Sequence, residues 1–493
     1  MLEGLGSIAD RATGGAGSSG GASVRSRVRN RLRTRRADRA FQRRTLPDGE
    51  PVADAPRHVV CVVVDALRAD TVDESLTPHL AAMSGTAAVS PATWTFPAVA
   101  SLLSGRYPHG HGAVRRTDDF ENAVADMTGL PPQPDSDIDL LPERLAGAGY
   151  RTRGTFAMIV PFLALSGRFE SHALYRDAAA ERVLADHLEW LADRRGERTF
   201  SYVHLGDLHE PVDPPADYWA THDIDGTIPD IRTWRFEDVA EPSPTVERYR
   251  THRRRLYRAA AEYVDNRLAA FLTRVEDFVE ETLVVIVGDH GEGFWERAAF
   301  HADNFADPRP AYCVGHGGAP YESVARVPLC VGGSSVDRGS GLTTGLEDGP
   351  ALADNSGDGG EERRSLIDVA PTVLENVGFR VSPALDGASL ASSVANRRLL
   401  VESARYGYEK RAVYDGDRKL LASRGDDVAV ALSLPDERPE PLPADREAEL
   451  LAELPPWPDA EPTEAGGASA GDRSDEPAVS RDVQRRLDRL GYR

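Results

Sequence analysis

The chain has 493 residues, too many for one small core, and this length predicts about two to three domains. Apolar residues make up 41% and charged residues 28%, which is typical of a soluble globular protein and excludes a wholly disordered chain or a multi-span membrane protein. The 58 basic and 79 acidic residues give a net charge of −21, and only Lys410 and Lys419 are lysines, which leaves 58 − 2 = 56 arginines. Because the acidic residues are spread along the chain, we attribute the charge to a halophilic surface and not to the substrate.

Cysteines and apolar segments restrict the class of protein further. Cys61, Cys313 and Cys330 are too few for a disulfide framework and lack the spacing of paired metal ligands. Cys61 and Cys330 lie in apolar runs, so we expect both to be buried in strands. No stretch approaches the roughly 18–20 apolar residues of a membrane span, and the N-terminus lacks the apolar core of a signal peptide. We therefore expect a cytoplasmic protein.

The N-terminal segment differs in charge from the rest of the chain. Residues 1–44 contain eleven arginines against Glu3, Asp10 and Asp38, a net charge of 11 − 3 = +8. We predict a basic, disordered tail over residues 1–50; the alternative is a helix that folds back on the acidic body. Contact of this tail with nucleic acid or an anionic lipid is the less favoured interpretation of its charge.

Strand-like and helix-like segments alternate from residue 57 onward. Residues 58–65 (HVVCVVVD) are apolar and β-branched and end in an acid, which is typical of a central strand of a parallel sheet. Residues 200–211 and 282–293 repeat this pattern of a strand followed by a polar turn. Apolar spacing predicts helices at 140–152 and 257–278. Strands that alternate with helices predict an α/β fold with a mainly parallel central sheet.

The composition changes again in the C-terminal third. A Gly/Asp/Ser-rich stretch at 336–362 predicts a surface insertion, and residues 399–423 have the pattern of two or three antiparallel strands. Residues 436–478, rich in Pro, Glu, Ala and Gly, predict an acidic linker. Residues 479–493 have the apolar spacing of a helix that docks back on the body. The body itself is expected to comprise residues 57–335 and 363–435.

Polar side chains gather where the predicted strands end. In an open parallel sheet, the ligand lies beyond the carboxyl ends of the strands. Carboxylates and imidazoles from separate strands are typical ligands of a divalent metal ion. Four groups of residues occupy such positions: Asp65; the segment around Thr95; His204, Asp207 and His209; and Asp289 with His290.

Eight motifs follow one another along the chain: VVVDALRAD, TPHLAAM, TWTFPAVASLLSGRYPHGHG, YVHLGDLHEP, VIVGDHGEGF, GHGGAPYESVARVPL, DVAPTVLENVGF and LDGASL. In order and spacing they resemble the sulfatase-like branch of the alkaline phosphatase superfamily. The resemblance implies an alkaline-phosphatase-like sandwich, in which helices flank a mainly parallel sheet and a small C-terminal subdomain contains an antiparallel sheet.

The resemblance places Thr95 at the nucleophile position of the family, with Pro97 and residues 103–105 in register. True sulfatases carry Cys or Ser there, in a C/S-x-P-S-R frame, and convert it to formylglycine. The arginine of that frame is Val99 in this chain. Threonine at this position is similar to the phosphatase, phosphodiesterase and phosphoethanolamine- or glycerophosphate-transferase branches, in which a threonine alkoxide attacks phosphorus.

The resemblance also implies a metal site. Asp65, Thr95, Asp289 and His290 would hold a divalent ion, either Mn, Zn, Ca or Mg. The family often carries a second acid beside the first, and Ala66 stands there in this chain, so we expect one metal ion and not two.

Four further residues are expected to contact the anionic ester. His209 and His316 match family positions that bind the anion or help to expel the leaving group, and both are expected to be catalytic as well as substrate-binding. Arg68 and His204 complete the expected substrate-binding set. Because lysine is scarce, the Lys/His position of the family is filled by His316, whose charge is expected to depend on pH near neutrality.

These residues together predict a metal-dependent hydrolase or transferase of phosphate or sulfate esters, with Thr95 as covalent nucleophile and a small anionic ester as substrate. Two alternatives remain open at this point. One is a sulfuric ester hydrolase that works without formylglycine. The other is a catalytically degenerate relative that binds an anionic glycan or lipid headgroup.

Overall fold

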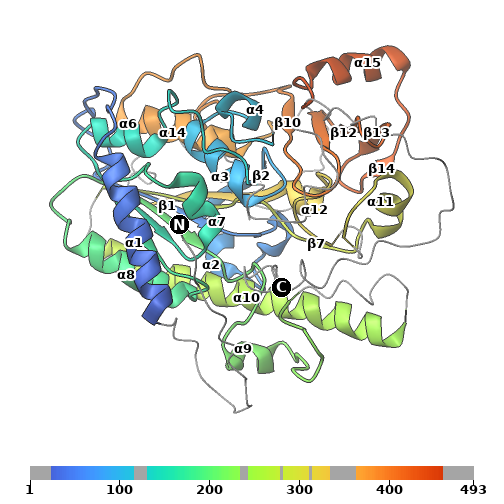
Figure 1. Ribbon diagram of the computed structural model, residues 1–493, viewed down its shortest axis with the longest axis horizontal. Coiled ribbons are helices and arrows are strands. Elements are labelled where there is room, and N and C mark those ends of the chain that lie inside the picture. The colour runs from blue at the N-terminus through green and yellow to red at the C-terminus, as the bar shows by residue number, and fades with distance from the viewer. Residues whose placement is uncertain are drawn as a thin grey trace, which may run out of the picture.

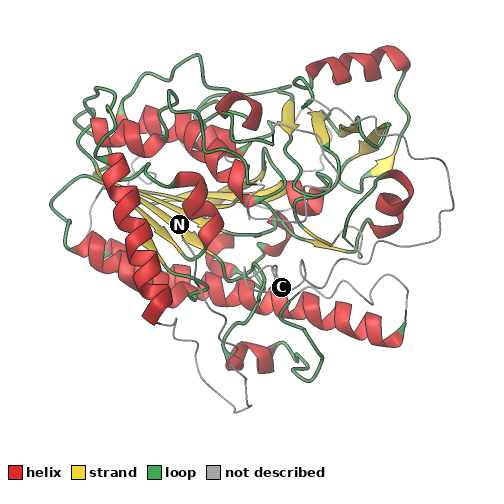
Figure 2. Cartoon of the chain, viewed as in Figure 1, coloured by secondary structure: helices red, strands yellow, loops and turns green. Residues whose placement is uncertain are grey.

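A seven-stranded sheet forms the centre of the computed structural model and lies between two layers of helices (Figures 1 and 2). The structure describes residues 24–115, 130–233, 243–277, 281–309, 314–333 and 362–458. The strands, in their order across the sheet, are β2 (Ser84–Val89), β9 (Arg326–Gly332), β6 (Thr282–Gly288), β1 (His58–Val64), β5 (Thr199–Leu205), β3 (Arg151–Phe156) and β4 (Ser171–Leu174). Only β9 runs against its neighbours, so the prediction of a mainly parallel sheet is confirmed.

Strand β1 is buried on both faces, as its uninterrupted apolar sequence predicts. Its odd-numbered residues from 59 to 63 face one hydrophobic core, and its even-numbered residues from 60 to 64 face the other. The helices of the first layer are α3 (Thr95–Ser104), α6 (Leu141–Gly147), α7 (Ile159–Leu165) and α14 (Val369–Val377), which follows η3 (Leu366–Asp368). Those of the second are α2 (Pro78–Ala81), α8 (Ala180–Ala192), α9 (Ala216–Thr221) and α10 (Pro244–Glu276).

Three parallel strands carry the site. β1 pairs with β5 on one side and with β6 on the other, and the ladders run from His58 opposite Thr199 and Thr282. The carboxyl ends of all three strands therefore lie at the same edge of the sheet. This register brings together residues that follow β1, β5 and β6 although the sequence separates them widely.

A second, five-stranded antiparallel sheet forms the C-terminal subdomain (Figure 1). Its strands are β10 (Leu399–Val401), β11 (Arg411–Asp415), β12 (Arg418–Ser423), β13 (Val428–Ser433) and β14 (Arg438–Pro439). This confirms the antiparallel strands predicted at 399–423. The helix α15 (Ala444–Glu453) covers the sheet through Leu450 and lies in the stretch for which the composition predicts a linker. The remaining short elements are η1 (Ala69–Thr71), α4 (Pro108–His111), β7 (Gly293–Phe294), α11 (Ala298–Asn304), β8 (Val314–Gly315) and α12 (Glu322–Ala325).

Part of the expected N-terminal tail is a helix, α1 (Val24–Phe41). Its buried face consists of Asn30, Ala37 and Phe41, whose spacing places them on one side of the helix. Asp38 of α1 accepts hydrogen bonds from the backbone and the ring of His172, both at 2.9 Å. Asn30 donates to the carbonyl of Leu174 at 3.4 Å. α1 is therefore attached to the edge strand β4.

Three other predicted features lie wholly or almost wholly outside the described residues: the insertion at 336–362, the docking helix at 479–493 and the position of Cys313. Cys61 and Cys330 are free, buried thiols in β1 and β9, as expected. Within the described ranges, every helix is too short or too polar to cross a membrane.

Both lysines of the chain are buried in the C-terminal subdomain. The ammonium group of Lys419 lies 2.5 Å from Glu437 and 2.9 Å from Glu322. That of Lys410 lies 3.6 Å from Asp426 and donates to the carbonyl of Tyr408 at 3.0 Å. The side chains of both lysines are 0% exposed. Both lysines of the chain are therefore shielded from solvent in the folded protein.

Candidate active site

Asp65 is the residue that follows β1, and its carboxylate lies at the centre of a buried polar cluster. Its Oδ2 accepts a hydrogen bond from the Thr95 hydroxyl at 3.2 Å and lies 3.1 Å from Nε2 of His204. The other ring nitrogen of His204 is hydrogen-bonded to the Tyr202 hydroxyl at 3.0 Å. The imidazole of His204, which is inside β5, therefore fixes the orientation of the Asp65 carboxylate.

Thr95 is the first residue of α3 and is almost completely buried. Its hydroxyl oxygen lies 3.1 Å from Nε2 of His290, in addition to its contact with Asp65. Trp94, the N-cap residue, has an extended backbone, which turns the chain into the helix at this point. At the N-terminus of α3 the aligned peptide dipoles favour negative charge, so this position suits a hydroxyl that ionises.

Asp289 and His290 follow β6 directly. Oδ1 of Asp289 accepts hydrogen bonds from the backbone N–H groups of Ala66, at 3.2 Å, and of His290, at 3.0 Å. Nδ1 of His290 lies 2.8 Å from the carbonyl of Gly291 and donates its proton there. The lone pair of Nε2 therefore points toward Thr95 and the two carboxylates.

The donor atoms of Asp65, Asp289 and His290 fit a divalent cation. One ligand atom from each residue lies within 4.8 Å of the others, and all three residues are buried. Oδ1 of Asp65 and Oδ2 of Asp289 have no hydrogen-bond partner, and His290 Nε2 lies 3.5 Å and 3.6 Å from these two atoms. Two buried carboxylate oxygens without donors favour a positive charge between them. In the part of the chain that the structure describes, no other group of three His, Cys, Asp or Glu residues is arranged in this way.

The pKa values reflect this concentration of charge. Burial and the nearby charge of Asp65 raise the pKa of Asp289. Burial alone would raise the pKa of Asp65 too, but His209, His204 and His290 outweigh it and hold that pKa well below its usual range. Burial lowers the pKa of His290, while Asp289 and Asp65 raise it more, so the net shift is upward. The cluster therefore binds positive charge strongly.

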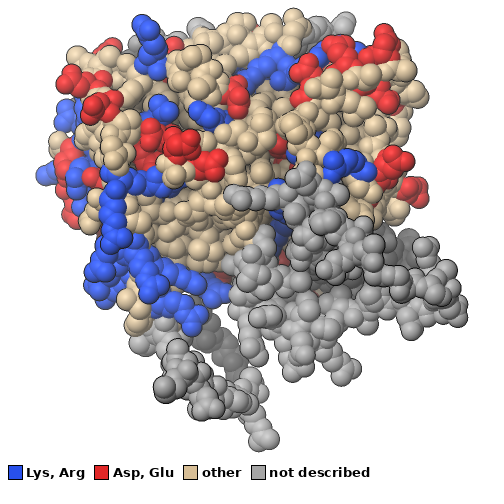
Figure 3. Space-filling view, turned by 45° about the horizontal axis from the view of Figure 1, so that its top comes forward, with Lys and Arg blue, Asp and Glu red and all other residues tan. Residues whose placement is uncertain are grey.

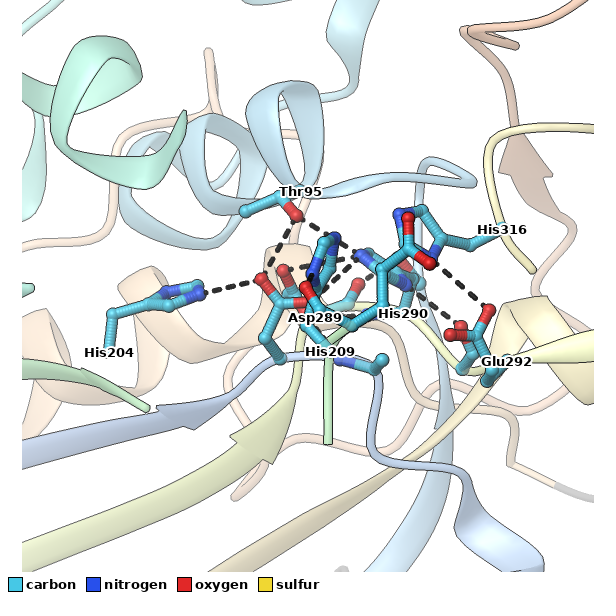
Figure 4. Close-up of polar contacts among 12 residues, drawn as sticks. Thr95, His204, His209, Asp289, His290, Glu292 and His316 are labelled. Carbon is cyan, nitrogen blue, oxygen red and sulfur yellow. Dashed lines mark hydrogen bonds and ion pairs between the residues drawn. The ribbon is translucent and has the colours of Figure 1, made fainter. Parts of the chain in front are cut away.

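His209 and His316 lie beside the cluster (Figure 4). Their ring centroids are 5.1 Å apart, and the ring of His316 is 4.2 Å from that of His290. Burial, and then the neighbouring His290 and His209, lower the pKa of His316 well below its usual value. The expectation that His316 titrates near neutrality is therefore wrong: its environment favours the neutral ring.

Glu292 is a member of the site that sequence reasoning missed. Its side chain is buried, Oε1 lies 3.2 Å from Nδ1 of His316, and Oε2 has no hydrogen-bond partner. Burial raises the pKa of Glu292 to about 7, although His209 and His290 oppose the shift. Its position in the DHGE motif, two residues after His290, is the sequence feature that could have identified Glu292 as a site residue. Glu292 orients the ring of His316.

Arg68 is not at the centre of the site. Its guanidinium lies 2.5 Å from Asp70 and 2.6 Å from Glu296, and it donates to the carbonyl of Glu292 at 2.9 Å. Arg68 therefore supports the loop that carries Glu292. His204 likewise lies behind Asp65, whereas Thr95, Asp289, His290, His209 and His316 converge.

Ala66 connects the two carboxylates. Its φ of 61° is in the left-handed region, which costs a residue with a side chain roughly 1–2 kcal/mol. The conformation is held by the bond from its N–H to Asp289 and by the Tyr257 hydroxyl, which donates to its carbonyl at 2.7 Å. Backbone strain of this kind is concentrated at functional sites.

A known protein family matches the part of the chain that carries this site. The family described as Sulfatase matches residues 57–378. The chain belongs to the sulfatase family. This family is part of the alkaline phosphatase superfamily of ester hydrolases, so the fold class and the enzyme class expected from the sequence are both confirmed. A buried Asp/Asp/His group is consistent with the metal site of this family.

Solved structures with the sulfatase fold are similar to this chain, at identities that carry the fold alone. One is BT4656 in complex with its substrate D-glucosamine-2-N,6-O-disulfate, with a TM-score of 0.55 and 14% identity over 77% of this chain and 91% of that one. A second is the phosphonate monoester hydrolase SpPMH from Silicibacter pomeroyi, with a TM-score of 0.54 and 15% identity over 76% and 89%. A third is the lipoteichoic acid synthase LtaP from Listeria monocytogenes, with a TM-score of 0.51 and 13% identity over 85% and 95%. A search of curated proteins gives no match.

Proposed function

We propose that this sulfatase-family protein is a metal-dependent hydrolase or transferase of phosphate or sulfate esters in which Thr95 is the covalent nucleophile. The observation that carries the proposal is the position of the Thr95 hydroxyl, which lies 3.2 Å from Asp65 and 3.1 Å from His290. A buried hydroxyl between a carboxylate and an imidazole is placed for deprotonation.

Asp65, Asp289 and His290 would hold one divalent cation. When bound, such a cation lowers the pKa of a coordinated hydroxyl and neutralises the negative oxygens of an ester. The fit rests on the two carboxylate oxygens without hydrogen-bond partners, Oδ1 of Asp65 and Oδ2 of Asp289. The identity of the cation, Mn, Zn, Ca or Mg, is part of the test.

The residues of the chain support a two-step reaction. In the first step the Thr95 oxygen forms a bond to phosphorus or sulfur, and the bond to the ester oxygen breaks. His316 lies beside His290 and His209 lies beside His316, so both imidazoles are placed to donate hydrogen bonds to the anion. The Thr95 proton passes to Asp65 or His290, which flank its hydroxyl, and the departing alkoxide takes a proton from water. In the second step water, or an acceptor alcohol, attacks the Thr95 ester and restores the hydroxyl.

Sulfate esters are the second candidate for the group transferred. The family and the disulfated substrate of BT4656 favour them. The phosphonate monoester hydrolase and the lipoteichoic acid synthase favour phosphorus. Thr95 in place of a formylglycine precursor favours phosphorus as well, and the retained Asp65, Asp289 and His290 argue against a degenerate binding protein.

The test compares nitrophenyl sulfate, nitrophenyl phosphate and bis-nitrophenyl phosphate, each assayed with the four cations. We expect hydrolysis of at least one ester, and loss of that activity in Thr95→Ala. After a rapid denaturing quench, mass spectrometry should locate a phosphoryl or sulfuryl group on the peptide that contains Thr95. Undiminished activity of Thr95→Ala would refute the assignment of the nucleophile.

A further inference from the structure

A cavity of 1190 Å³ lies between helix α1 and the carboxyl-end loops of β3, β4 and β5. Arg27 and Arg31 of α1 line one side of it, and the loop from Tyr175 to Ala179 lines another. His209 lines it as well, together with Gly206 and Asp207. Because His209 also lies beside His316 in the candidate active site, the cavity adjoins the position expected for the reacting ester.

The cavity is too large for a phosphate or sulfate group alone. Cavities of about 300–1,000 Å³ already hold drug-sized ligands. An ester bound at Thr95 would therefore leave most of this volume to the alcohol part of the substrate. The side chains that line the cavity indicate which groups that part of the substrate carries.

Arg27 and Arg31 are the charged side chains that α1 contributes to the described lining of the cavity, and several acids of the opposite wall already have partners. Asp186 is paired with Arg153 at 2.6 Å, and Asp213 is paired with Arg232 at 2.8 Å. Burial raises the pKa of Asp207 to about 6, and its carboxylate accepts a bond from a backbone N–H. Asp177 also lines the cavity and lies 3.8 Å from Arg176, and Glu210 is the remaining acid of the lining. A ligand anion would therefore be bound by those lining arginines that have no carboxylate partner.

Two arginines that line the cavity lack a carboxylate partner among the described residues. Arg31 makes no ion pair there, and Arg182 lies over the ring of Tyr175 at 5.4 Å without one. Elsewhere on α1, burial, and then Arg29 and Arg176, lower the pKa of Arg33. In Figure 3 the basic side chains of α1 form a continuous blue patch on this face of the molecule.

Helix α1 is fixed relative to the cavity. The bonds of Asp38 to His172 and of Asn30 to Leu174 attach it to β4, the edge strand next to the cavity. Arg44, just after the helix, pairs with the buried Glu143 at 2.7 Å. The backbone of α1 is therefore held in position before any ligand arrives, which lowers the entropic cost of binding at its side chains.

We propose that this cavity is a second anion-binding subsite, in which Arg31 and Arg182 bind a phosphate, sulfate or carboxylate group that the substrate carries on its alcohol part. The substrate class is thus a doubly anionic ester, one anion at Thr95 and one beside α1. This inference rests on the proposed function for the first anion. The second anion explains why a strongly acidic protein keeps a cluster of arginines next to its active site.

The test uses two aryl esters of whichever class the protein hydrolyses, identical except that an alkyl substituent ends in a methyl group in one and in a phosphate in the other. At equal ionic strength we expect kcat/KM to be at least about tenfold higher for the phosphate-bearing ester, the effect of a charge-assisted hydrogen bond. In Arg31→Gln and Arg182→Gln this preference should fall, mainly through KM, while the methyl-bearing ester is hydrolysed as before. Both arginines are exposed, so the variants are expected to fold.

Arg35→Gln and Arg39→Gln are the matched controls, because both residues are exposed on the same helix and neither lines the cavity. They should keep the full preference. Equal kcat/KM for the two esters in the wild type, or an equal loss in the controls, would overturn the subsite. If neither ester is hydrolysed, the proposed function fails, and the subsite is tested separately by calorimetry with 1,4-butanediol bisphosphate. Binding that Arg31→Gln weakens supports the subsite, and no binding by the wild type refutes it.

Discussion

The hydroxyl of Thr95 lies 3.2 Å from the Asp65 carboxylate, although 30 residues separate them in the chain. Asp65 follows the central strand β1 and Thr95 begins helix α3, so their contact depends on the packing of α3 against the sheet. The same carboxylate contacts His204 of the neighbouring strand. Asp65 is therefore the residue that connects Thr95, the neighbouring strand β5 and the candidate cation site.

Loss of one carboxylate should abolish cation binding. In the wild type, a divalent cation at 100 times its Kd is expected to stabilise the fold by about 2.7 kcal/mol, because it binds only the native state. Asp289→Asn should remove this stabilisation, measured as the shift in the thermal unfolding midpoint with and without Mn²⁺. Asp207→Asn, a buried acid at the same edge of the sheet, is the control and should respond as the wild type does.

Replacing Glu292 should impair turnover without affecting the cation. Glu292→Gln weakens the contact that orients His316, and kcat is expected to fall about 10- to 100-fold, as for other residues that orient a functional side chain. The thermal response to Mn²⁺ should persist. Glu296→Gln, which changes a partner of Arg68, is the matched control. A Glu292→Gln enzyme with normal kcat would show that His316 does not need this carboxylate.

Asp207 should make stability depend on pH. Burial raises its pKa to about 6, above the ordinary value, so the folded state favours the neutral acid. At pH 2 the group is protonated in both the folded and the unfolded state and costs nothing. As pH rises from about 4 to about 6, the unfolded state ionises while the folded state stays neutral, so the fold loses stability, and above pH 6 the loss is complete. Asp207→Asn should therefore gain about 3 kcal/mol relative to the wild type at pH 8 and almost nothing at pH 2, measured by urea unfolding.

The buried pair of Arg168 and Glu143 should be costly to break. Both side chains are 1% exposed, and Arg168 also donates to the carbonyls of Pro134, at 2.6 Å, and Ile138, at 3.0 Å. Arg168→Met leaves the Glu143 carboxylate with only Arg44 as a cationic partner, and we expect a loss of about 3–5 kcal/mol in the free energy of unfolding. Arg153→Met, which breaks a partly exposed pair with Asp186, should cost less than about 1 kcal/mol. Equal losses would contradict this account.

The sequence predicts those parts of the fold that depend on local pattern. The apolar run of β1, its terminal Asp65 and the Asp289–His290 pair after β6 are visible because a central parallel strand needs apolar residues on both faces and a polar residue where it ends. The antiparallel strands after residue 399 follow from their alternation and turns. Each of these features is encoded within about ten residues.

The rest depends on contacts between distant segments. Helix α1 contains so many arginines that its composition hides the docking face, and its partners in and near β4 lie more than 130 residues away. In the sequence, charge alone does not distinguish Glu292 from the other members of the 79 acidic residues. Only the folded structure shows that it lies against His316. Arg68 is adjacent to the site in sequence, but nearby acids hold its guanidinium. Local pattern carries no information on which of many equal charges is buried.

The burial of both lysines gives the native protein an unusual chemical property. An acylating reagent that modifies lysine amines should find neither side chain accessible in the folded state. Lys410 immediately precedes β11 and Lys419 lies within β12, so local opening of this one sheet would make both reactive. The rate of lysine acylation would therefore measure how often the C-terminal subdomain opens.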